Sequence, residues 1–176
     1  MKKTLLLALF LVGMVPVSAM ASDTLVKFKG GIGVIPVSSG AGLNADATSP
    51  NVNRNVVRGV NPPGQIWMIA DLRATVKVDG RITVDGRGLL LAGGNGIGTN
   101  AGQRVFATLI CEAAAPFTLH NSDVAGVPLE PNGDFRIDDV LSDTPLADCA
   151  SPVLLIRNPA GAWFAAGILD RDSDDD

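Results

Sequence analysis

Side chains capable of acid–base or nucleophilic chemistry are few in this sequence, and their spacing matches no catalytic motif. His120 is the only histidine, and Glu112 and Glu130 are the only glutamates. A serine nucleophile is commonly presented by a G-x-S-x-G turn, and no such pattern occurs in the chain. Asp123 follows His120 closely, but proximity in sequence does not establish the geometry of a triad. The sequence therefore predicts no catalytic residue.

Carboxylates are concentrated in two stretches. One runs from Asp134 to Asp148, and the other is the segment 170–176, DRDSDDD, which we interpret as a solvated acidic tail. Calcium takes about six to eight oxygen ligands, so the first stretch raises the alternative of a calcium-stabilised adhesion-type module. A second alternative is a secreted hydrolase or isomerase that works through carboxylates alone. That chemistry needs two acids facing each other across a cleft, and no spacing marks such a pair, so no metal or catalytic site is predicted.

A glycine-rich stretch at 93–102, GGNGIGTNAG, resembles a nucleotide-binding loop only in composition. The dinucleotide fingerprint G-x-G-x-x-G opens a helix within a β-α-β unit. After Gly96 and Gly98 the next glycine, Gly102, comes one residue too late, and a strand pattern follows instead of a helix. We therefore predict a loop here and no bound cofactor.

The long polar stretch at 38–64 carries the two candidate ligand contacts. It is rich in Asn, Ser, Gly and Pro and longer than an ordinary connection, which favours a functional or disordered loop. Arg54 and Arg58 lie within it and could contact an anionic ligand. The chain has no run of clustered lysine and arginine of the kind that contacts nucleic acid, so no nucleic-acid partner is predicted. Whether the partner is a protein or a small molecule is left open.

The first 21 residues have the three parts of a secretory signal peptide. Lys2 and Lys3 form a basic start, an apolar run of about a dozen residues follows, and Ala19-Met20-Ala21 fits the small-residue cleavage rule. The apolar run is too short for a membrane span, which takes about 20 residues. We therefore predict cleavage after Ala21, export to the periplasm or the cell exterior, and no membrane span.

Cleavage would leave a chain with 12 basic and 18 acidic side chains, a net charge near −6. Its body, residues 22–169, is long enough for one domain with its own core. Cys111 and Cys149 are both in this body. Because disulfides persist in exported proteins, the pair is expected to be bonded.

The clearest strand signal lies in residues 65–91. Apolar and polar residues alternate over 72–78 and again over 82–84, on either side of Asp79-Gly80. Side chains of a strand point alternately to its two faces, and Asp-Gly between two such runs is typical of a β-hairpin. We therefore predict a half-buried hairpin here.

The register of this hairpin follows from the facing of its side chains. A three-residue loop, 78–80, places Val76 opposite Ile82 and Ala74 opposite Val84, so that one face stays apolar. A two-residue loop would mix polar and apolar side chains on both faces. The three-residue loop also requires a left-handed residue, which predicts that role for Gly80. The opposite face then receives the pairs Thr75 with Thr83, Arg73 with Asp85, and Asp71 with Arg87.

Short strand patterns separated by Gly, Pro and Asn turns recur along the chain, without a convincing helix pattern in the predicted mature part. We interpret Asp85-Gly86 as a bulge, and 153–157 with 163–169 as a last hairpin. About nine or ten such strands predict an all-β fold, an antiparallel β-sandwich, with a small closed β-barrel as the alternative. The predicted function is that of an exported, non-catalytic protein with a binding or structural role.

Overall fold

The computed structural model describes residues 24–43, 45, 50–144, 146 and 149–171. The predicted signal peptide, residues 1–21, lies outside the described residues, as do residues 172–176 of the predicted acidic tail. The described chain is built from strands, and no helix occurs in it. It accordingly contains no helical segment with the length and apolar character that crossing a bilayer requires.

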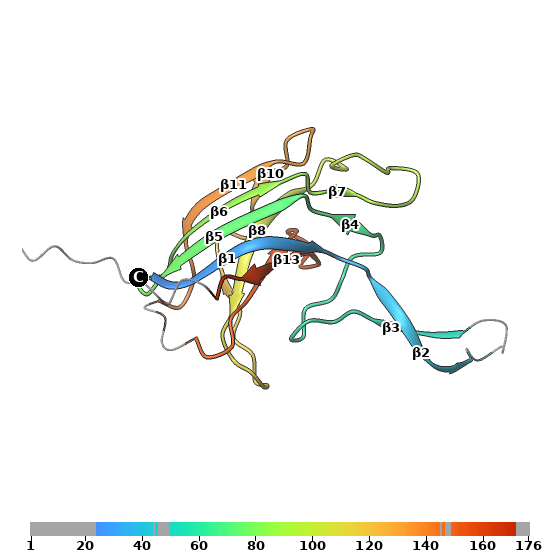
Figure 1. Ribbon diagram of the computed structural model, residues 1–176, viewed down its shortest axis with the longest axis horizontal. Helices are drawn as coiled ribbons and strands as arrows, with labels where there is room; N and C mark the ends of the chain where they lie inside the picture. The colour runs from blue at the N-terminus through green and yellow to red at the C-terminus, as the bar shows by residue number, and fades with distance from the viewer. Residues whose placement is uncertain (1–23, 44, 46–49, 145, 147–148, 172–176) are drawn as a thin grey trace, which may run out of the picture.

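Nine of the thirteen strands in the described residues form one antiparallel sheet that curls into a half-barrel (Figure 1). These strands are β1 (Thr24–Gly33), β5 (Asp71–Lys77), β6 (Arg81–Arg87), β8 (Arg104–Ile110), β9 (His120–Asn121), β10 (Val127–Pro128), β11 (Phe135–Val140), β12 (Val153–Arg157) and β13 (Trp163–Leu169). Their order is β10-β8-β12-β13-β1-β5-β6-β11, and β9 also pairs with β8. The predicted all-β antiparallel class is confirmed. The strand number exceeds the prediction because four of the thirteen strands are only two residues long.

Two small sheets complete the fold, one formed by β2 (Val37–Leu43) and β3 (Pro50–Arg54), the other by β4 (Trp67–Met68) and β7 (Leu90–Leu91). The β2–β3 hairpin stands out from the body of the molecule (Figure 1). It occupies much of 38–64, so part of the stretch that we predicted as a long polar loop forms two strands instead. Strand propensity depends on context, and the Asn and Ser residues on one face of this hairpin hid its alternation.

The predicted register of the central hairpin is confirmed. β5 and β6 flank a three-residue loop, with Val76 opposite Ile82 and Ala74 opposite Val84, and all four side chains are buried. Gly80 has a φ of +86°, and its N–H donates to the carbonyl oxygen of Lys77 at 2.9 Å. The three polar pairs predicted for the other face also form: Thr75 with Thr83, Arg73 with Asp85, and Asp71 with Arg87.

Replacing Gly80 by alanine is expected to destabilise the protein by about 1 kcal/mol more than replacing Gly94, because added atoms in a packed site force its neighbours to move. Both glycines have a left-handed φ, +86° at Gly80 and +76° at Gly94, so the backbone strain is matched. A Cβ at Gly80 would lie 2.0 Å from Thr144 Cγ2, whereas one at Gly94 would lie 3.4 Å from Gln65 Nε2. Urea unfolding of both variants measures the difference, and equal losses would contradict the packing of Thr144 on the loop.

Gly86 does not form the predicted bulge. It pairs regularly with Leu72, and β6 continues unbroken to Arg87. A Cβ at Gly86 would lie 2.2 Å from the ring of Phe135 on the neighbouring strand β11. Glycine within a strand often marks such a close approach, so the sequence pattern was misread because the reason for this glycine lies on another strand.

Strands β8 and β12, and the first three residues of β13, 163–165, are buried on both faces. Along β8, the six residues 105–110 are each at most 3% exposed, although alternate side chains point to opposite faces. One face lines the interior of the curled sheet. On the other face, residues 55–63, which we call the strap, contact the start of β13: the carbonyl oxygens of Asn55 and Asn61 accept hydrogen bonds from Nε1 and N of Trp163, at 3.0 and 3.1 Å. Two buried faces explain why these strands read as continuous apolar runs.

The predicted pairing of the cysteines is present: Cys111 and Cys149 form a disulfide. Cys111 directly follows β8, and Cys149 lies shortly before β12, which pairs with β8. The bond therefore fixes the connection from β8 to β12, two strands that are buried on both faces.

Candidate functional site

Arg54 and Arg58, the predicted ligand contacts, both direct their guanidinium groups to acceptors within the protein. Arg54 Nη2 donates to the carbonyl oxygen of Pro62 at 2.9 Å. Arg58 Nη1 donates to the carbonyl oxygens of Ile110 and Ser151, at 3.1 and 2.6 Å, and Nη2 donates to Ser151 Oγ at 2.7 Å. The structure therefore uses Arg58 to fasten the strap near the disulfide, and it does not bring the two arginines together around a groove.

A third arginine, Arg157, is also held by internal contacts. Its guanidinium lies 5.2 Å from the ring centroid of Phe106 and donates to Thr108 Oγ1 and to the carbonyl oxygen of Gly161. Burial lowers the pKa of Arg157 from its usual value, because the charged form loses hydration. An arginine pKa starts so high that this group keeps its charge, and its contacts indicate a structural role.

The imidazole of His120 is not paired with an acid. Its Nδ1 donates to the carbonyl oxygen of Ser142 at 3.2 Å, which places it beside the end of β11. Asp123, the acid closest to it in sequence, accepts a hydrogen bond from the N–H of Ala125 through Oδ1. Hydrogen bonds, first that from the Thr118 hydroxyl, lower the pKa of the Glu112 carboxyl group from its usual value.

Asp134 and Asp139 stabilise a turn and the seam between the two ends of the sheet. Asp134 accepts hydrogen bonds from Gly88 N and Asn132 Nδ2, both at 3.0 Å. Asp139 Oδ2 accepts one from Asp123 N at 2.7 Å, which connects β11 to the segment before β10. In the described residues, no three acidic, histidine or cysteine side chains gather into a group that could hold a metal ion; Asp148 lies outside them.

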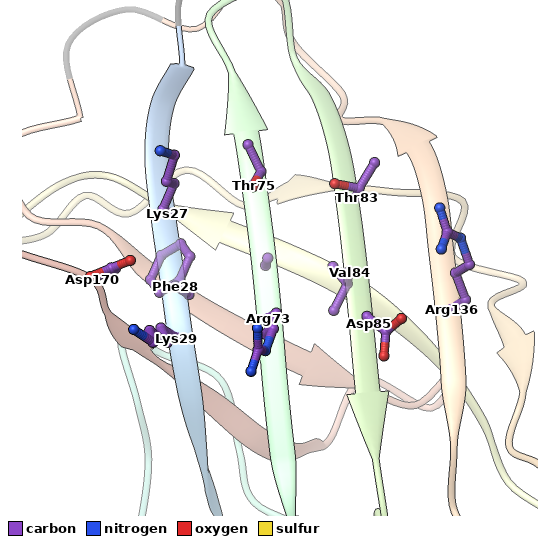
Figure 2. A pocket seen from close by; sticks show the side chains of 11 residues that line it. Lys27, Phe28, Lys29, Arg73, Thr75, Thr83, Val84, Asp85, Arg136 and Asp170 are labelled. Atoms are coloured by element: carbon purple, nitrogen blue, oxygen red, sulfur yellow. The ribbon is translucent and has the colours of Figure 1, made fainter. Parts of the chain in front are cut away.

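A different site, absent from the predictions, is an open groove of about 400 Å³ on the outward face of the main sheet. Figure 2 shows its side chains arising from four adjacent strands, β1, β5, β6 and β11, and from Asp170, which follows β13. Alternation along each strand points Phe28, Ala74 and Val84 into the core, where they are buried, so their backbone forms the floor of the groove. The outward positions carry the polar lining, which we call the cationic face: Lys27, Lys29, Arg73, Thr75, Thr83, Asp85 and Arg136.

Strand pairing arranges the cationic face in two rows. Lys29 lies opposite Arg73, Arg73 opposite Asp85, and Asp85 opposite Arg136. The second row runs from Lys27 through Thr75 and Thr83 to Asp138. Neighbouring strands lie about 4.8 Å apart, so the first row spans about 14 Å from β1 to β11. The cations of the first row, Lys29, Arg73 and Arg136, therefore lie one, two or three strand spacings apart.

The positive charges on the cationic face are only partly balanced by acidic side chains, since four cations line the groove with two acids, Asp85 and Asp170. Lys29 and Arg73 are directly opposed, and like charges in that position destabilise a sheet. Arg73 has a partner in Asp71, at 3.3 Å between Nε and Oδ2, but both side chains are exposed and such pairs are weak. A protein with a formal net charge of −4 thus gathers four cations and two acidic residues, Asp85 and Asp170, along one groove.

Comparison with known proteins adds no functional assignment. No model of a protein family matches the chain, and no curated protein or solved structure is significantly similar to it. The chemistry available in the groove therefore has to come from its residues. Arginine forms paired hydrogen bonds with carboxylates, sulfates or phosphates, lysine supplies a point charge, and the threonine hydroxyls donate or accept. These groups bind anions, and the groove holds no nucleophile–base pair.

Proposed function

We propose that this protein is an exported, non-catalytic binding protein whose cationic face binds an extended, acidic polysaccharide. The observation that carries the proposal is the row Lys29–Arg73–Asp85–Arg136, three cations in register across four strands. Directly opposed like charges lower stability, so their presence favours a role in binding. The disulfide between Cys111 and Cys149 supports an oxidising compartment, in agreement with the predicted signal peptide.

The spacing of the charges favours a polymer over a small anion. A small anion is best held by donors that converge on one point, whereas these cations are spread over about 14 Å of sheet. Carboxylate or sulfate groups on consecutive sugars could meet them one after another. Asp85, in the middle of the row, has acceptor oxygens for sugar hydroxyl groups.

Two features disfavour nucleic acid as the ligand. Single-stranded nucleic acid is usually held by exposed aromatic side chains that stack on bases. Phe28, the aromatic residue of the groove lining, is 3% exposed and points into the core. Double-stranded DNA carries one charge per about 1.7 Å, and its partners commonly supply more cations than this face has.

Changing Lys29 and Arg136 together to glutamate is expected to lower the affinity for heparin, a sulfated and carboxylated polysaccharide, by about tenfold at low salt. The slope of the logarithm of affinity against the logarithm of salt concentration should become shallower, because fewer counterions are released. Isothermal titration at several salt concentrations measures both. Thermal unfolding of the variant shows whether its fold is retained.

Lys77 on β5 and Arg81 on β6 provide a matched control, because both lie outside the groove lining. Changing these two residues to glutamate alters the net charge by the same amount. The control should keep heparin affinity within about twofold of the parent protein. Equal losses in the two variants would show that net charge, and not the cationic face, governs binding, and the proposal would fail.

A further inference from the structure

We infer that the acidic segment 170–176 of the same chain docks on the cationic face and competes there with an external polyanion. The inference rests on the proposed function, because it concerns how that same face is regulated. It is drawn from three observations: where residue 170 is held, the charge of the segment, and the distance the segment has to cover.

The start of the segment is fixed at the border of the groove. Asp170 is part of the groove lining, and its N–H donates to the carbonyl oxygen of Lys27 at 2.9 Å. Figure 2 shows Asp170 beside β1, next to Lys27 and Lys29. The residues that follow Asp170 therefore begin at the end of the cationic face that carries both lysines.

The charges of the segment and the face are opposite and similar in number. Beyond Asp170, the segment contains four aspartates and one arginine, a net charge of −3. The face contains four cations, Lys27, Lys29, Arg73 and Arg136, and one acid, Asp85, a net charge of +3. Carboxylates are the anionic groups that lysine and arginine bind most commonly in proteins, so the segment resembles a short stretch of the proposed ligand.

The segment is long enough to cross the face. Six residues beyond Asp170, fully extended, reach about 20 Å. The row from β1 to β11 spans about 14 Å, so the aspartates can reach each cation in turn. Exposed ion pairs are individually weak, but attachment to the same chain gives the segment an effective concentration in the millimolar range. Docking of this kind is reversible and is weakened by salt.

Competition with the segment would make the cationic face select ligands that carry many closely spaced negative charges. A single free anion cannot displace a tethered segment with several carboxylates, whereas a polymer carrying many charges can. The segment would thus lower the affinity of the face for weakly charged ligands without blocking it.

Zero-length carbodiimide cross-linking of the full chain tests the contact directly, because it joins a lysine amine to a carboxylate only when the two groups touch. We expect amide links between Lys27 or Lys29 and aspartates of 172–176 in the monomer fraction, identified by peptide mass spectrometry and lost at 1 M salt, where the screening length falls to about 3 Å. Lys77, outside the groove lining, is the internal control and should remain unlinked. Links found only in a cross-linked dimer would place the segment on a second copy, and links to Lys77 alone would show nonspecific contact; either result, or no link at all, would overturn the inference.

A second measurement tests competition. Changing Asp172, Asp174, Asp175 and Asp176 to asparagine is expected to raise the affinity for heparin by about three- to tenfold at low salt. Unchanged affinity would refute competition. The two proposals fail separately: heparin binding without cross-links contradicts only the docked segment, whereas cross-links without heparin binding contradict only the proposed ligand.

Discussion

Replacing Gly33 by alanine is expected to lower the free energy of unfolding by about 3 kcal/mol, because the added methyl group would overlap backbone atoms that cannot turn away. A Cβ at this position would lie 2.2 Å from the carbonyl oxygen of Trp67 and 2.7 Å from Cα of Met68. Two hydrogen bonds of the next residue, Val34, hold this contact in place. Val34 N donates to the carbonyl oxygen of Phe164, and Trp67 N donates to the carbonyl oxygen of Val34. β1 and β4 would have to separate to admit the methyl group.

Gly64→Ala is the matched control for this prediction. Neither Gly33 nor Gly64 has a left-handed φ, so the two substitutions differ in packing and not in backbone strain. No atom lies within 4 Å of a Cβ built at Gly64. The control should therefore change stability by less than about 0.5 kcal/mol, as surface substitutions usually do. Urea unfolding followed by tryptophan fluorescence compares the two, and a Gly33→Ala protein as stable as the control would contradict the close approach of β1 to β4.

Reducing the disulfide between Cys111 and Cys149 is expected to cost about 2–4 kcal/mol. The bond closes a loop with a sequence separation of 38, and a loop of that length restricts the unfolded chain considerably. Cys111 is 9% exposed and Arg58 holds the neighbouring backbone at Ile110 and Ser151, so the folded state has little freedom to relax after reduction. Unfolding in urea, with and without a phosphine reductant, measures the loss.

The double substitution of Cys111 and Cys149 by alanine separates the effect of losing the disulfide from any other effect of the reductant. This variant should be insensitive to reductant and should resemble the reduced parent protein in stability. Alkylation without reductant, read by intact mass, should leave both cysteines of the parent protein unlabelled. Labelling of both cysteines under those conditions would show that the bond is not formed.

Hairpins were the part of the fold that sequence patterns predicted best. In the central hairpin, the alternation of apolar residues and one Asp-Gly dipeptide were sufficient to derive five of the six cross-strand pairs, because both strands lie within a few residues of the loop. The last hairpin, β12 with β13, was predicted with the same boundaries. In each hairpin, the partner of a strand is the next strand in the sequence, so alternation and the type of turn are enough to select one register.

Predictions failed where the cause lay on a distant segment. Gly86 was interpreted as a bulge, although its role is to admit Phe135 from β11. Arg58 was named as a candidate ligand contact, and its own segment gave no sign of the acceptors that the fold supplies from Ile110 and Ser151, far along the chain. The β2–β3 hairpin was interpreted as a loop because polar residues dominate one of its faces. The residues of one segment do not specify which distant segment will pack against it.

The sequence by itself determined that the chain is all-β and antiparallel, that its cysteines form a pair, and which residues of β5 and β6 face outward. The tertiary structure decided that β1 lies beside β5 and β11 beside β6, and only this order brings Lys29 and Arg136 into one row with Arg73. The physical reason is that alternation assigns each side chain to a face of its strand, but not to a neighbouring strand. Pairing between segments far apart in the chain is selected by the packing of the whole core, and the cationic face is a product of that pairing.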